Sequence, residues 1–279
     1  MPLTLRNVEP ARGMRWITDA FRLYRRRPLG FISLFAVFVV AFLLVSQVPV
    51  LGALAMFTLP LLSLGFMVAA RSALLDGPVR FSQYIEPLRT DAPRRRALLL
   101  LCAIYGASML LIVWLANSLS GDAIGRFQGL LTSGSNEQAL IEALQSDNGL
   151  RTASTTLAVL GSLLSIPFWH AAPLVHWGGQ GVWQSLFSST LALWRTRGAF
   201  ALYALVWVAV AALPLPVVVL LVAVLFGMLG VPQLTLVAVW LVWAVFWSVF
   251  YISVLFTFND SFGVPAAAPA EAVPADIIS

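Results

Sequence analysis

The clearest pattern in the chain is a helical alternation of hydrophobic and polar side chains between residues 12 and 27. On a helical wheel, one half is hydrophobic and the other half carries most of the arginines. The hydrophobic half comprises Met14, Trp16, Ile17, Ala20, Phe21, Leu23 and Tyr24, and the polar half comprises Arg12, Arg15, Thr18, Asp19, Arg22, Arg25 and Arg26. This pattern predicts an amphipathic helix that lies on a membrane surface and ends at Pro28.

Six stretches are apolar and long enough to cross a bilayer, which takes about 20 residues. They cover residues 30–48, 51–75, 97–117, 155–176, 199–227 and 234–258. Pro60 predicts a kink in the second stretch, and Pro214 and Pro216 predict a bend in the fifth. Two more amphipathic segments, residues 79–89 and 182–197, precede the third and fifth stretches. The predicted fold is therefore all-α: a polytopic membrane protein with six transmembrane helices in three hairpins, each preceded by a cytoplasmic amphipathic surface helix.

This pattern divides the chain into three parts. Residues 1–29 hold the first cytoplasmic amphipathic helix, and residues 30–258 form the membrane domain. A polar insertion at residues 119–151 interrupts that domain, and Ser135 with Gln138 fits a capping box at the start of a short helix there. Residues 259–279, rich in Ala and Pro, predict a disordered cytoplasmic tail.

Composition supports a membrane protein and limits the available chemistry. Hydrophobic residues make up 60% of the chain and charged residues only 10%, whereas about a quarter of a soluble domain is charged. The mean hydropathy is +0.89. Cys102 is the one cysteine and lies in an apolar stretch, which excludes a disulfide framework and a cysteine metal site.

The arginines predict the orientation, because loops rich in arginine stay in the cytoplasm. All 17 basic residues are arginine. Seven fall before the first stretch, six from Arg71, near the end of the second stretch, to Arg96, and two between the fourth and fifth, which leaves Arg126 and Arg151 for the other side. Both termini are therefore predicted to be cytoplasmic, in a multi-pass protein of a bacterial inner membrane.

Internal similarity supports a repeated unit. Phe66, Ala69, Ala70, Gly77, Phe81 and Ile85 match Phe168, Ala171, Ala172, Gly179, Trp183 and Phe187 at one constant offset. A second offset aligns the segment around residues 23–31 with residues 193–201. These matches predict parallel repeats related by an axis along the membrane normal.

Two segments resemble a known family. WITDAFRLYRRRPL at residues 16–29 and LGFMVAARSALLDG at residues 64–77 look like an uncharacterised family of proteobacterial six-span inner-membrane proteins. That family is itself similar to the membrane domain found beside some glycerophosphodiester phosphodiesterases. The resemblance implies a structural likeness only: it brings no catalytic or binding residues, and the soluble phosphodiesterase domain is absent here.

Signs of catalysis are missing from the sequence. There is no HExxH motif, no P-loop, no GxSxG motif and no dinucleotide fingerprint, so we expect no enzyme activity and no cofactor. His170 is the best candidate for a polar site inside a span, although a buried histidine is more often a hydrogen-bonded packing residue. His176 lies six positions further on, off the same helix face, so the two histidines do not predict a metal pair.

The sequence favours a non-catalytic binding protein, an accessory or scaffold subunit that engages anionic lipids or other membrane proteins and does not bind nucleic acid. The candidate residues for lipid or partner binding are Arg22, Arg25, Arg26, Arg94, Arg95, Arg96 and Arg195. One alternative is a transporter or channel for an apolar or lipid-like solute, opened by kinks at the prolines. Catalysis at the membrane surface would require Arg94–Arg96 and His170 to converge on a phosphate.

Overall fold

The protein is helical throughout the part that the structure describes. The computed structural model describes residues 4–134, 138, 142, 146–231 and 233–263, and no strand occurs among them. Six helical segments in this part are long and apolar enough to cross a membrane. The prediction of an all-α protein with six candidate spans is therefore confirmed, while the predicted capping box at Ser135 lies outside the described residues.

The six candidate spans differ in how continuous they are. The first is α2 (Pro28–Ser46), the third is α5 (Ala92–Leu119) and the sixth is α13 (Leu234–Phe262), and each of these is one unbroken helix. The other three are divided. The second comprises α3 (Pro49–Ala55), η1 (Met56–Thr58) and α4 (Leu59–Leu74), the fourth α8 (Asn148–Phe168) and α9 (Ala171–His176), and the fifth α11 (Arg197–Ala212) and α12 (Pro214–Met228).

Proline accounts for the divided spans. Pro60 and Pro214 each fall in the first turn of a new helix, where the missing N–H costs nothing. Leu213 leaves helical geometry immediately before Pro214, with φ −115° and ψ −74°. Pro167 lies near the end of α8, and the chain leaves the helix at Trp169 and His170 before α9 begins. The interruptions expected at Pro60 and Pro214 are thus present.

The first amphipathic helix, α1 (Arg12–Arg26), covers other helices of the same chain. It packs mainly against α11 and α13, and its hydrophobic residues Trp16, Ala20 and Leu23 are buried there. The sequence assigned this hydrophobic face to the membrane surface. The structure instead packs it against the same chain. Trp16 contacts Phe200 and Tyr203 of α11 at 5.2 and 5.8 Å between ring centroids, and its Nε1 donates a hydrogen bond to Asp260 of α13.

The second predicted amphipathic helix, residues 79–89, is replaced by two short 3-10 helices, η2 (Phe81–Tyr84) and η3 (Glu86–Arg89). Local polar contacts compete here with an α-helix. The Gln83 side chain accepts a hydrogen bond from the Arg80 N–H and donates one to the Pro78 carbonyl, at 2.8 and 3.0 Å. Pro87 then prevents the continuation of a helix. The third predicted amphipathic segment forms a regular helix, α10 (Val182–Arg195).

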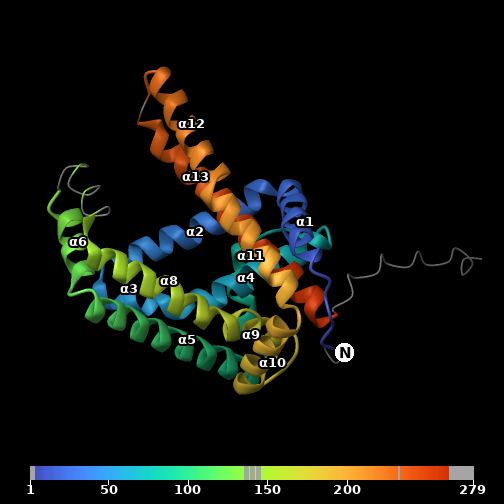
Figure 1. Cartoon of the computed structure of the whole chain (residues 1–279). Coiled ribbons are helices and arrows are strands. Elements are labelled where there is room, and N and C mark those ends of the chain that lie inside the picture. The colour runs from blue at the N-terminus through green and yellow to red at the C-terminus, as the bar shows by residue number, and fades with distance from the viewer. Residues whose placement is uncertain (1–3, 135–137, 139–141, 143–145, 232, 264–279) are drawn as a thin grey trace, which may run out of the picture.

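The core lies at one end of the molecule. A large hydrophobic cluster joins α1, the start of α2, α4, α11 and the last turns of α13. From this end the helices diverge: α12 and the first part of α13 extend upward in Figure 1, and α5 and α8 extend to the left with α6 (Ala123–Thr132) at their tip. The arms leave apolar surface uncovered: in α12, Leu215 is the one buried residue among those described.

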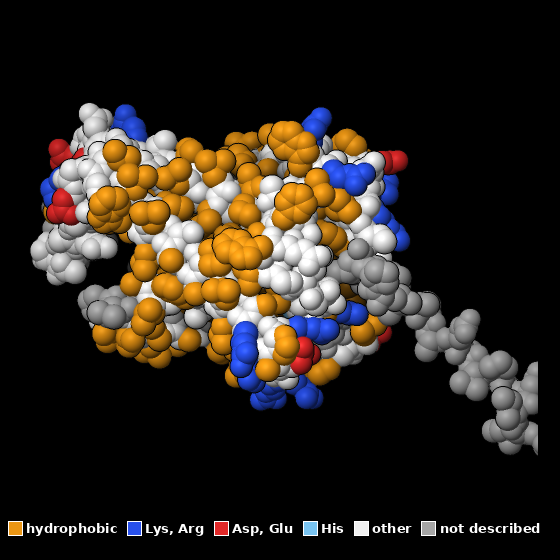
Figure 2. All heavy atoms as spheres, turned by 90° about the horizontal axis from the view of Figure 1, so that it is seen from below, with side chains coloured by type: hydrophobic (Ala, Val, Ile, Leu, Met, Phe, Trp, Pro, Cys, Tyr) orange, Lys and Arg blue, Asp and Glu red, His pale blue; other side chains and the backbone are white. Residues whose placement is uncertain are grey.

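Hydrophobic side chains cover a wide band of the surface. Figure 2 shows this band between a few charged groups at its left end and a larger number of arginines toward its right and lower edges. An apolar band flanked by charge matches a protein that crosses a bilayer, where lipid replaces water as the solvent.

The polar insertion is held together by Asp147. This carboxylate caps α8 by accepting a hydrogen bond from the Gly149 N–H at 2.7 Å, and it pairs with Arg126 of α6 at 3.2 Å. The hydrogen bond from Arg126 is the main reason that the pKa of Asp147 lies below its ordinary value.

Helix α13 continues past residue 258 to Phe262, so residues 259–262, which the sequence assigned to a disordered tail, are helical. Residues 264–279 lie outside the described part.

Candidate functional site

The outward face of α1 carries the arginines that the sequence selected. Arg25 and Arg26 are exposed, and neither pairs with a carboxylate among the described residues. Arg22 is also exposed and pairs with Asp19 one turn earlier, with 3.0 Å between Nη1 and Oδ1. Three guanidinium groups on the last turns of one helix therefore face away from the protein core.

The other selected arginines lie in two places. Arg94, Arg95 and Arg96 are exposed in the first turn of α5, and Arg195 is exposed at the end of α10. Arg94 Nε lies 3.4 Å from Asp91, and its Nη1 lies 3.4 Å from the carbonyl oxygen of His176. Helix α5 thus brings Arg94 to the end of the fourth span, a contact between elements that the sequence did not indicate.

A second arginine approaches the same end of the fourth span. The Arg71 guanidinium lies over the Trp177 ring, 5.2 Å from its centroid. Arg94 contacts the backbone of His176, whereas His170 is fully buried among the rings of Phe200, Phe258 and Phe262. The described contacts therefore do not join Arg94 to His170.

His170 is fully buried at the interruption between α8 and α9. Its Nε2 lies 3.0 Å from the Thr257 hydroxyl of α13, and its backbone N–H donates to the Ser189 hydroxyl of α10 at 3.0 Å. The rings of Phe200, Phe258 and Phe262 surround the imidazole. This histidine joins three helices, the role of a packing residue, and a hydrogen-bond partner for its Nδ1 is missing among the described residues.

Sequence reasoning missed Asp260 because it placed this residue in the tail. Its carboxylate accepts a hydrogen bond from Trp16 Nε1 at 2.7 Å and pairs with Arg12 at 2.7 Å. The sequence does contain a signal that the helix continues to Asp260. No proline or glycine lies between the long apolar stretch and Asp260, so no helix-ending residue occurs at position 258.

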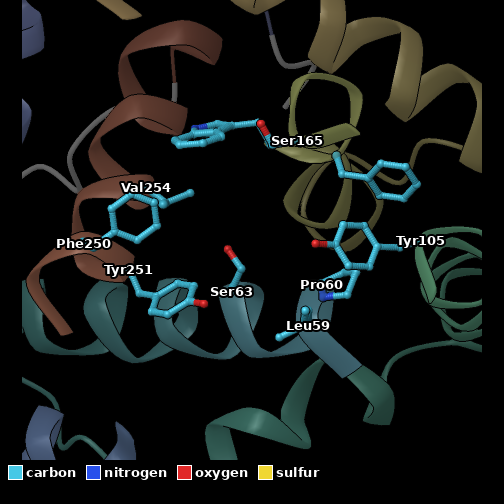
Figure 3. Close-up of a pocket in the computed structure, with 10 residues that line it drawn as sticks. Leu59, Pro60, Ser63, Tyr105, Ser165, Phe250, Tyr251 and Val254 are labelled. Carbon is cyan, nitrogen blue, oxygen red and sulfur yellow. The ribbon is translucent and has the colours of Figure 1, made fainter. Parts of the chain in front are cut away.

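Four spans line an open cavity with a volume of about 150 Å³. Its walls combine aromatic rings, aliphatic side chains and hydroxyl groups, and all the lining residues are uncharged: Leu59, Pro60, Ser63, Tyr105, Ser165, Phe168, Trp169, Phe250, Tyr251 and Val254. Figure 3 shows the oxygens of Ser63 and Tyr105 turned toward its open centre. Ser63 and Tyr105 lie close to the midpoints of their spans, so the cavity lies deep between the ends of the helices.

The polar groups of this cavity differ in their partners. Ser165 donates to the Ser162 carbonyl at 2.7 Å, and the Trp169 indole N–H donates to Thr257 at 3.2 Å. The hydroxyls of Ser63, Tyr105 and Tyr251 have no hydrogen-bond partner within the described chain. The sequence gave no warning of this arrangement, because the hydroxyl residues come from different apolar stretches and hydropathy does not show which stretches meet.

The described residues contain no group of three or more His, Cys, Asp or Glu side chains that could hold a metal ion. The arginine clusters and the cavity present guanidinium groups, hydroxyl groups and apolar surface. Such groups suit the binding of lipids, small uncharged molecules or other proteins.

A comparison with curated proteins identifies a relative. The chain is 33% identical over 211 residues to a probable inner membrane protein of Burkholderia thailandensis, and the match covers 75% of this chain and 77% of the relative. The chain belongs to the family of this inner membrane protein. With the six apolar helices, this membership makes it a multi-pass inner membrane protein of a family without a characterised role.

The remaining comparisons give no match for this inner membrane protein. No known family profile matches the chain, and no solved structure matches it. The likeness to the membrane domain found beside glycerophosphodiester phosphodiesterases has no support in these findings.

Proposed function

We propose that this inner membrane protein is a non-catalytic binding protein, an accessory or scaffold subunit that engages anionic lipids or other membrane proteins through its arginine-rich end. In this proposal the six spans form three hairpins, and both termini face the cytoplasm. The uneven distribution of arginines supports this orientation, because 15 of 17 fall on one side of the proposed spans.

Helix α10 supports contact of this end with the membrane, because it leaves an aromatic face uncovered beside arginine. Trp183, Phe187 and Trp194 are 73%, 68% and 68% exposed and share one face at helical spacing. Its serines, Ser185 and Ser189, are fully buried against the protein. An exposed aromatic face at the end of a bundle of spans suits the interface between lipid headgroups and acyl chains, where Trp is enriched. Of the three predicted amphipathic segments, α10 therefore fits a surface helix best.

Arginine adds a preference for negative charge. The Arg197 guanidinium lies 5.6 Å from the centroid of the Trp194 ring, next to the exposed Arg195. On α1 the hydrophobic face is occupied by α11 and α13, which leaves Arg22, Arg25 and Arg26 to face outward. Each arginine near an anionic surface contributes about 1 kcal/mol, an attraction that salt screens.

The test replaces Arg22, Arg25 and Arg26 by glutamine and measures bound lipid by native mass spectrometry after extraction in mild detergent. Loss of three charges should weaken retention of phosphatidylglycerol and cardiolipin by tenfold or more, at about 1 kcal/mol for each arginine. The matched control replaces the same residues by lysine, which keeps the charge and should keep the lipid.

Unchanged retention of both lipids and proteins in the glutamine variant would refute the role of α1. Retention lost equally in the lysine variant would also count against the proposal, because charge alone would then not explain binding. Insertion should survive in both variants, since Arg94, Arg95 and Arg96 still mark the cytoplasmic side.

The cavity between four spans favours a second candidate function, a transporter or channel for an apolar or lipid-like solute. It places uncharged hydroxyls and aromatic rings at mid-span depth. Solute uptake into proteoliposomes that contain the purified protein would support this function, and uptake no faster than in empty liposomes would refute it.

A further inference from the structure

One cavity is lined by three residues from different spans whose hydroxyl groups have no hydrogen-bond partner among the described residues. Ser63 belongs to α4, Tyr105 to α5 and Tyr251 to α13. At mid-span depth no bulk water reaches these groups, so an unpaired hydroxyl there is costly. Because all three residues line the same space, we infer that a bound molecule supplies the missing hydrogen-bond partners, and a carbonyl oxygen is an acceptor that each hydroxyl can use.

The space in the cavity admits a small ring. A volume of about 150 Å³ is roughly that of a cavity that holds benzene, and because the cavity is open, substituents and a tail can extend out of it. Aromatic side chains form much of the wall. Tyr105 and Phe168 meet edge to face with their centroids 5.1 Å apart, and Phe250 and Tyr251 do so at 5.5 Å. Such walls favour a planar ring.

The lining also limits the charge and the polarity of the ligand. All lining residues are uncharged, so an ionised ligand would have no counter-charge in a medium where isolated charge is costly. Phenol and serine hydroxyls each have a proton to donate, which suits carbonyl oxygens on the ligand. The position between spans requires a molecule that dissolves in hydrocarbon.

We propose that this cavity binds the ring of a membrane-soluble quinone, an uncharged ring with carbonyl oxygens and a hydrocarbon tail. Tyr105, Tyr251 and Ser63 donate hydrogen bonds to the carbonyl oxygens, and the aromatic walls hold the ring. This site does not depend on the arginines of the proposed function, since all of its lining residues are uncharged.

The test measures binding of decylubiquinone to the full chain in nanodiscs of phosphatidylcholine, which carries no net charge. Quenching of tryptophan fluorescence reports the bound ring, because Trp169 lines the cavity. Tyr105→Phe and Tyr251→Phe each remove one hydroxyl and keep the ring, so each should raise the dissociation constant about two- to tenfold. Tyr24→Phe, on α1 outside the cavity lining, is the matched control and should leave it unchanged.

A second variant and a second probe separate this proposal from simpler accounts. Ser63→Leu fills the cavity and should abolish saturable quenching, which keeps the test informative if a tyrosine variant fails to fold. Decylbenzene, with the same tail but no carbonyl, should not compete with decylubiquinone. The proposal is overturned by absence of saturable binding to the wild-type chain, which would indicate a cavity filled by water alone. Equal binding to the tyrosine variants, or equal competition by decylbenzene, would overturn it as well.

Discussion

At the residue scale, Asp260 holds the arginine-rich helix in place. Its carboxylate receives hydrogen bonds from Arg12 and Trp16 of α1, while the rest of the Trp16 ring is buried among aromatic side chains. A hydrogen bond to a charged group contributes more than one between neutral groups. Asp260 therefore anchors α1 on α13. The position of α1 in turn determines the direction in which Arg22, Arg25 and Arg26 point.

This contact makes a specific mutation informative. Asp260→Asn keeps the shape of the side chain but removes the charge that faces Arg12, and we expect it to destabilise the docking of α1 by about 1–3 kcal/mol. Because α1 contains several arginines, limited trypsin digestion reads out its release, and cleavage within residues 12–27 should accelerate. The control is Asp19→Asn, which disrupts only the exposed pair with Arg22, an interaction worth about 0–1 kcal/mol. Equal digestion rates for the two variants would contradict this role of Asp260.

The contacts of individual residues were predicted least well from the sequence. The amphipathic wheel of residues 12–27 correctly separated buried Trp16, Ala20 and Leu23 from exposed Arg22, Arg25 and Arg26. Periodicity reports which face is apolar but not what covers it. For that reason the helical wheel assigned the apolar face to the membrane surface, whereas α11 and α13 cover it. The wheel also did not identify Asp260 as the partner of Arg12.

At the element scale, close approach of helices depends on glycine at the contact. Gly13 of α1 lies against the backbone of α11: a Cβ atom there would clash with the Ala199 carbonyl oxygen and lie 2.9 Å from the Tyr203 nitrogen. Gly65 of α4 faces the Tyr84 ring in the same way. Backbone atoms cannot rotate aside as a side chain does, so the contact at Gly13 leaves no room for adjustment without moving a helix.

Gly13→Ala tests this contact. Alanine favours an isolated helix by about 1 kcal/mol over glycine, yet overpacking at a tight contact costs about 1–3 kcal/mol, so we expect net destabilisation. The matched control is Gly161→Ala on α8, where nothing lies within 4 Å of the added methyl group and the helix preference of alanine should dominate. Thermal unfolding of both variants in detergent, followed by circular dichroism, should show opposite shifts relative to wild type. A midpoint for Gly13→Ala at or above that of Gly161→Ala would show that α1 does not pack this tightly on α11.

Elements as such were well predicted where hydrophobicity and proline decide them. All six apolar stretches are helical, and interruptions occur next to Pro60 and Pro214. The segment at residues 79–89 failed because side-chain hydrogen bonds of Gln83 and the ring of Pro87 outweigh an amphipathic pattern of only a few residues. Short patterns carry little free energy, so local chemistry decides their structure.

At the scale of the whole molecule, the helices meet at one end and diverge at the other (Figure 1). The meeting end holds the large hydrophobic cluster and the docked helix α1, and α12 on the diverging side is almost entirely exposed. Sequence alone could not predict this shape, because a helix that faces lipid and one that faces another helix are equally apolar. The cavity at Tyr105 and Tyr251 escaped prediction because its lining comes from stretches that are far apart in the sequence.

Orientation in the membrane is the remaining property of the whole molecule that the sequence predicts, and it can be tested with two reporters. We expect Thr132, in the polar insertion, to lie outside and Ser82, among the arginine-rich segments, to lie in the cytoplasm, because loops rich in arginine resist translocation. Both side chains are exposed, so a cysteine at either position is accessible to a reagent. In a Cys102→Ala background, a membrane-impermeant maleimide should label Thr132→Cys in intact spheroplasts and should label Ser82→Cys only after permeabilisation. Labelling after permeabilisation shows that the Ser82 reporter is reactive. If Ser82→Cys is labelled in intact spheroplasts, the arginine-rich end faces outward, and the anionic lipids assigned to it would have to come from the other leaflet.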